Sequence, residues 1–84
     1  MKWRLLLDIE VIEFLQTLRA PMRQRLFAVF RRIQDFPGNY RQFTETDPAG
    51  RLLSALICEG YAIYYWEDFA DRHIKVMRVC LADR

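Results

Sequence analysis

The sequence is poor in the residues that build metal sites and disulfide frameworks. Its 84 residues include two cysteines, Cys58 and Cys80, and one histidine, His73. The cysteines have no metal-ligand spacing, and a single histidine cannot complete a zinc set. We therefore predict no metal and no cofactor. In a cytosolic protein, both cysteines are expected to be small buried hydrophobic residues.

Long hydrophobic runs, internal repeats and low-complexity tracts are also missing. The apolar runs, such as residues 5–7 and the longest one at residues 61–66, are far below the roughly 18 residues that a membrane span needs. Asp8 and Glu10 follow the first run at once, which is unlike a secretory signal peptide. We expect a soluble cytoplasmic protein with no membrane partner. We also expect a single domain over residues 1–84. Two domains would each have about forty residues, and domains of that size usually need disulfides, metals or oligomerisation to be stable.

Charge of one sign is not in large excess. The net charge of +2 is too weak by itself to indicate nucleic-acid binding. Its distribution is more informative, because residues 1–42 carry eight basic and four acidic side chains and residues 43–84 carry five and seven. Most of the basic residues are arginines, which suit bidentate contacts with phosphate or carboxylate groups.

The spacing of apolar residues predicts a strand, two helices and then further strands. The strand covers residues 2–7, Asp8 caps the first helix, and Pro21 lies in the first turn of the second helix, which ends at residues 36–39. From residue 40 the period changes to two, which predicts strands at residues 40–46, 51–58, 61–67 and 72–81. We predict an α+β fold of order β-α-α-β-β-β(-β), with an antiparallel sheet packed on one face by a two-helix hairpin.

The two-residue loop Glu59-Gly60 fixes the register of the central hairpin. In that register Leu56 and Ile63 face the helices. The opposite face is apolar and has no helix over it; its residues are Leu53, Ala55, Ile57, Ala62, Tyr64 and Trp66. We expect the isolated chain to self-associate through this face, for example as a homodimer, unless a partner covers it.

The order of elements, with Gly60-Tyr61-x-Ile63-x-Tyr65 followed by His73-Ile74-Lys75-Val76-Met77-Arg78-Val79, resembles the RelE/ParE superfamily of type II toxin–antitoxin toxins. The resemblance implies a RelE-like fold and a small cytoplasmic toxin neutralised by its cognate small antitoxin. One branch of the superfamily cleaves mRNA in the ribosomal A site, without a metal, through the 2′-hydroxyl of the RNA. The other branch poisons DNA gyrase and is not a nuclease. We expect an endoribonuclease-like translation inhibitor; the alternatives are a gyrase poison and a degenerate toxin fold without activity.

The catalytic pattern of the ribosome-dependent nucleases is largely missing. They carry two lysines on the strand before the Gly-Tyr hairpin, where this chain has Leu53 and Ala55, and an arginine directly after the Gly-Tyr pair, where it has Ala62. Their arginine beyond the last strand has Arg84 as its closest equivalent, and their later tyrosine has no counterpart. If this chain cleaves RNA, it uses a different set of residues.

We select four candidates as phosphate binders or proton shuttles: Arg51, His73, Arg78 and Arg84. Histidine is the residue type that exchanges protons near neutral pH, so His73 is the candidate acid or base. The alternative for His73 is an exposed residue at a strand start. For Arg78 the alternative is an ion pair with Glu67 or Asp68, beside a cross-strand aromatic cluster of Tyr64 and Trp66.

Two binding surfaces complete the predictions. The candidate RNA-binding residues are Arg25, Arg31, Arg32, Tyr61, Tyr64 and Trp66. The arginines could track phosphates along the second helix, or they could form only a solvated face, whereas the aromatic rings could stack on bases. The candidate antitoxin contacts are Phe27, Phe30, Leu53 and Trp66.

Overall fold

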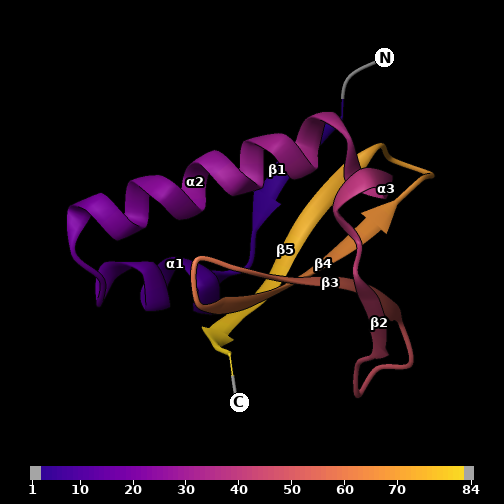
Figure 1. Cartoon of the computed structure of the whole chain (residues 1–84). Helices are drawn as coiled ribbons and strands as arrows, with labels where there is room; N and C mark the ends of the chain where they lie inside the picture. The colour runs from indigo at the N-terminus through magenta and orange to yellow at the C-terminus, as the bar shows by residue number, and fades with distance from the viewer. Residues whose placement is uncertain (1–2, 83–84) are drawn as a thin grey trace.

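The computed structural model describes residues 3–82 as a five-stranded sheet with its two longer helices on one face (Figure 1). The elements in chain order are β1 (Arg4–Leu7), α1 (Ile9–Gln16), α2 (Ala20–Asp35), α3 (Pro37–Tyr40), β2 (Phe43–Thr46), β3 (Leu52–Cys58), β4 (Tyr61–Asp68) and β5 (His73–Leu81). This confirms the predicted α+β class and the succession of a strand, two helices and a run of strands.

Local signals set the helix boundaries as predicted. The Asp8 carboxylate accepts a hydrogen bond of 3.1 Å from the backbone N–H of Glu10, which caps α1. Pro21 occupies the first turn of α2, where its missing N–H costs no helical hydrogen bond. Residues 37–40 differ from the prediction, because they form the short helix α3 and delay the next strand to Phe43.

The sheet has the strand order β1-β5-β4-β3-β2. The expectation of an antiparallel sheet is wrong in one place, because β1 runs parallel to β5, with Leu5 opposite Ile74. Parallel neighbours need a long connection, and the chain between β1 and β5 includes three helices and three strands. The remaining strand pairs are antiparallel, so the sheet is mixed.

The Glu59-Gly60 loop sets the register of β3 and β4 as the sequence predicts. Leu56 lies opposite Ile63, and Ala55 lies opposite Tyr64. Both loop residues have positive φ, 58° at Glu59 and 83° at Gly60, as a tight two-residue hairpin turn requires. The core between the helices and the sheet consists of Val11, Leu15, Leu26, Val29, Phe30, Ile33, Leu56, Ile63, Tyr65, Ile74, Val76 and Val79.

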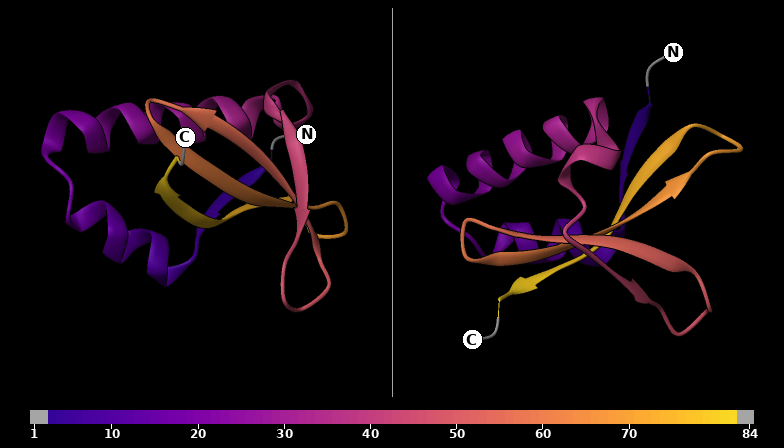
Figure 2. Two further views of the ribbon diagram at one scale, coloured as in Figure 1. Left: turned by 60° about the horizontal axis from the view of Figure 1, so that its bottom comes forward. Right: turned by 45° about the vertical axis from the view of Figure 1, so that its right-hand side comes forward.

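The opposite face of the sheet, which we call the second face, is not bare. Leu53, Ala55, Ala62 and Tyr64 form a second buried cluster there, and Leu53 is only 6% exposed. The strands twist strongly, and the turn between β2 and β3 projects away from α2 (Figure 2). The expectation of an open apolar face is therefore met only in part, because four of its six predicted residues are buried, whereas Ile57 is 48% exposed and Trp66 is half-buried. Self-association as a homodimer stays a prediction.

A polar network fastens α3 to the end of the sheet. The buried Tyr65 hydroxyl donates a hydrogen bond of 2.5 Å to the carbonyl of Pro37. Nearby, the Glu67 carboxylate accepts hydrogen bonds from the Ser54 hydroxyl at 2.6 Å and from Arg41 at 3.1 Å. Burial, followed by the charge of Glu67, raises the pKa of Tyr65 to about 12.

This network predicts how Tyr65→Phe changes stability with pH. The variant leaves the Pro37 carbonyl without its partner, so at neutral pH it should lose about 1–2 kcal/mol in free energy of unfolding. The folded chain holds the Tyr65 proton more tightly than the unfolded chain, in which the pKa is about 10. The stabilising contribution of this proton is therefore complete below about pH 10 and is lost as the pH rises towards 12.

Urea denaturation at neutral and alkaline pH measures the effect. The stability difference between wild type and Tyr65→Phe should shrink as the pH rises above about 10. Tyr61→Phe is the control, because the half-buried Tyr61 ring packs edge-on against Phe14 and its hydroxyl makes no hydrogen bond within residues 3–82. A constant difference for Tyr65→Phe at every pH would contradict the role given to its proton.

Candidate functional site

A groove of about 320 Å³ opens beside the second face. Three parts of the chain line it: the junction of β1 and α1, the turn from β2 into β3, and the middle of β5. Leu53 and Met77 are its apolar residues from the strands, and Arg51 and Arg78 are its two cations. The remaining lining residues are Asp8, Glu10, Glu45, Asp47 and Pro48.

Arg51 is held tightly by the turn that precedes β3. Its Nε lies 3.0 Å from Oδ2 of Asp47, and its backbone N–H donates to Oδ1 of the same carboxylate at 2.8 Å. The hydrogen bond from this backbone N–H, together with the guanidinium, lowers the pKa of Asp47. The Arg51 guanidinium also lies 5.2 Å from the centre of the Trp66 ring. These contacts fix the position of Arg51.

Arg78 reaches the groove from β5 and is held more loosely. Its Nη2 lies 3.4 Å from Oε2 of Glu45, and its guanidinium lies 4.1 Å from the centre of the Tyr64 ring. Burial acts to lower the pKa of Arg78, but the hydrogen bond with Tyr64 and smaller charge effects outweigh it and raise the pKa. The pairing considered from the sequence, with Glu67 or Asp68, is wrong, because Glu67 bonds to Ser54 and Arg41 instead.

The groove therefore carries more negative than positive charge. Four carboxylates line it against two guanidinium groups, and each guanidinium is already paired with one of the carboxylates. Lining charges of this kind disfavour a phosphate unless one of the arginines changes partner. The aromatic rings nearby are engaged as well: Tyr64 is only 8% exposed and lies under Arg78, so a base could stack on it only after Arg78 moved.

The four predicted catalytic residues do not all come together. Arg51 and Arg78 line the same groove. His73 lies at the start of β5 opposite Asp68, five residues before Arg78, which corresponds to roughly 15 Å along a strand. Arg84 lies outside the described residues. The structure thus supports a shared site for Arg51 and Arg78 and removes His73 from it.

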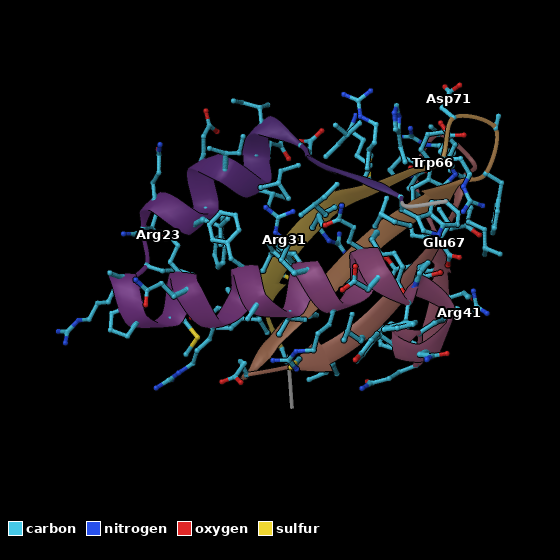
Figure 3. The ribbon with its side chains drawn as sticks, turned by 90° about the horizontal axis from the view of Figure 1, so that it is seen from above. Arg23, Arg31, Arg41, Trp66, Glu67 and Asp71 are labelled. Atoms are coloured by element: carbon cyan, nitrogen blue, oxygen red, sulfur yellow. The ribbon has the colours of Figure 1, made fainter. Side chains whose placement is uncertain are left out.

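The predicted RNA-binding residues lie on three separate surfaces. Arg25, Arg31 and Arg32 are exposed on α2. Tyr61 packs against Phe14 on the helix side of the sheet, with ring centres 5.8 Å apart, whereas Tyr64 and Trp66 belong to the second face. In Figure 3, Arg31 lies along α2, while Trp66 lies at the far end of the sheet, near Asp71. These residues therefore cannot form one binding surface.

The predicted antitoxin contacts also need correction. Phe30 is completely buried, because it points into the core between α2 and the sheet, and Leu53 is buried in the second cluster. Phe30 cannot contact a partner in the folded chain, and Leu53 can be reached only through the groove that it lines. Phe27 is 40% exposed on α2, and Trp66 is half-buried at the edge of the second cluster, so these two remain accessible.

A possible metal-binding group lies away from the groove, at the turn between β4 and β5. Ligand atoms of Asp68, Asp71 and His73 lie within 4.8 Å of one another. The sequence signal for this group is the spacing Asp-x-x-Asp-x-His across a predicted turn, which differs from the cysteine and histidine sets of zinc sites. Cys58 and Cys80 are free and half-buried, so the expectation of full burial is only partly met.

Within residues 3–82, no helix is long and apolar enough to cross a membrane.

Comparison with solved structures identifies the fold as RelE-like. The sequence itself matches no family model and no curated protein. A chain of the archaeal RelE–RelB complex from Pyrococcus horikoshii OT3 superposes with a TM-score of 0.80 at 17% identity, over 100% of this chain and 99% of that one. An arginine-to-alanine mutant of the E. coli toxin RelE, in the free state, gives a TM-score of 0.71 at 16% identity, over 99% and 86%. The fold implied by the resemblance is confirmed.

Proposed function

We propose that this chain is the toxin of a type II toxin–antitoxin module and that it inhibits translation by binding RNA in the groove of the second face. The observation that carries the proposal is the convergence of Arg51 and Arg78 on one groove. The similarity in fold to a chain of a RelE–RelB complex and to the E. coli toxin RelE supports a toxin with a small antitoxin as its partner.

The groove recognises an RNA backbone when a phosphate displaces the carboxylate that pairs with one of its arginines. Each guanidinium can donate two parallel hydrogen bonds to a phosphate. Trp66, half-buried beside Arg51, offers an aromatic surface at the edge of the same face. If the bound RNA is the mRNA on a ribosome, the chain would stop translation by holding that mRNA in the groove.

We further propose that the chain cleaves the mRNA that it binds. Attack by the RNA's own 2′-hydroxyl needs a proton acceptor and a proton donor beside the phosphate. The candidate acceptors in the groove are carboxylates, of which Asp47 is a poor one, because both of its oxygens bond to Arg51 and these bonds lower its pKa. His73 would take part only if the RNA reached the turn between β4 and β5.

Induced expression in a bacterial host tests the toxin proposal. The chain alone should arrest growth, and co-expression of its cognate antitoxin should restore growth and yield a complex that co-purifies. DNA damage with continued translation would instead indicate a gyrase target. Unchanged growth at a verified level of folded protein would refute the toxin proposal and indicate a toxin fold without activity.

A further inference from the structure

The two groove arginines differ in how firmly their carboxylate partners hold them. Asp47 binds Arg51 through both the side chain and the backbone N–H, and it also belongs to a closed turn in which the N–H of Gly50 donates to its carbonyl at 2.9 Å. The turn therefore holds the Asp47 carboxylate in place beside the Arg51 guanidinium. Glu45 makes one contact of 3.4 Å with Arg78, and their side chains are 47% and 55% exposed.

The position of Glu45 allows it to release Arg78 without unfolding. It lies on β2, an edge strand of four residues whose side chains are all exposed, so a change of rotamer needs no repacking of the core. Exposed ion pairs of this geometry are weak and open readily. Arg78 would remain over the Tyr64 ring at 4.1 Å after Glu45 left, and would thus stay directed into the groove.

We propose that Glu45 acts as an internal substitute for a phosphate group on Arg78 and thereby limits the affinity of the groove for RNA. The carboxylate occupies hydrogen-bonding capacity of the guanidinium that a phosphate oxygen would use. An incoming RNA must first displace Glu45, whereas Asp47 keeps Arg51 in place as a fixed second cation. The inference rests on the proposed function for its biological role, but the competition at Arg78 is a property of the groove alone.

Binding of a labelled single-stranded RNA oligonucleotide to the purified chain tests this directly. Glu45→Gln should bind the RNA about two- to fivefold more tightly than wild type, because one guanidinium is freed from competition. The slope of log K against log salt concentration should also become steeper by about 0.7, the value for one additional phosphate contact on a single strand. Glu13→Gln is the matched control, since it removes the same charge from an exposed position on α1 that does not line the groove.

A gain in Glu45→Gln that exceeds the gain in Glu13→Gln and disappears when Arg78→Ala is added supports the proposal. Equal gains in the two glutamine variants, or a gain that survives Arg78→Ala, would overturn it, because either result would trace the effect to net charge. Equilibrium unfolding of each variant verifies that it is folded. If the gain is found but induced expression leaves growth unchanged, the competition stands and the proposed toxin function fails.

Discussion

Phe30→Ala should lower the free energy of unfolding by about 3–5 kcal/mol, whereas Phe27→Ala should lower it by less than about 1 kcal/mol. The two residues are one helical turn apart on α2, and their rings touch edge-on with centres 5.7 Å apart. Only Phe30 is fully buried, so its truncation leaves a cavity in the main core, while the 40% exposed Phe27 borders solvent.

Urea denaturation of both variants measures this difference as a shift in the midpoint of the unfolding transition. The dependence of the unfolding free energy on urea concentration should stay the same. The result also separates core from interface on α2, because Phe27→Ala should weaken antitoxin binding in a chain that remains folded. A cost for Phe30→Ala below about 1 kcal/mol would contradict its assignment to the core.

Arg51→Ala combined with Arg78→Ala should abolish growth arrest. Each guanidinium supplies charge-assisted hydrogen bonds worth about 1.5–3 kcal/mol, so loss of both should weaken RNA binding by about a hundredfold or more. The fold should persist, because exposed ion pairs such as Arg78–Glu45 contribute at most about 1 kcal/mol.

Arg4→Ala combined with Arg19→Ala is the matched control for that double variant. It removes the same two positive charges from exposed positions that do not line the groove. Growth arrest should persist in this control. Loss of arrest in both double variants would indicate that general positive charge, and not the groove, mediates toxicity.

The sequence predicts those parts of the fold that depend on neighbouring residues. The Asp8 cap, Pro21 at the start of α2 and the Glu59-Gly60 hairpin are local signals, and the hairpin loop alone assigns side chains of β3 and β4 to their faces. The parallel pairing of β1 with β5 is not encoded in this way, since it depends on how the intervening helices return the chain to the sheet.

The candidate site could be predicted only in part for a similar reason. The alternation of side chains along a strand places Arg51 and Arg78 on the second face, but it cannot reveal which carboxylates pair with them. Glu45 meets Arg78 across 33 positions of sequence, through the curvature of the sheet. Phe30 was misassigned because helical spacing places it near the edge of the apolar stripe, and only the packing of α2 against the sheet decides its burial.

A cell-free translation reaction with the purified chain tests the central claim most directly. Wild-type protein should stop synthesis of a reporter polypeptide, the Arg51→Ala and Arg78→Ala double variant should not, and Glu45→Gln should inhibit at a lower concentration than wild type. Mapping the 5′ ends of the reporter mRNA in the same reaction distinguishes cleavage from binding alone. Synthesis that continues at an unchanged rate with folded wild-type protein would contradict the account.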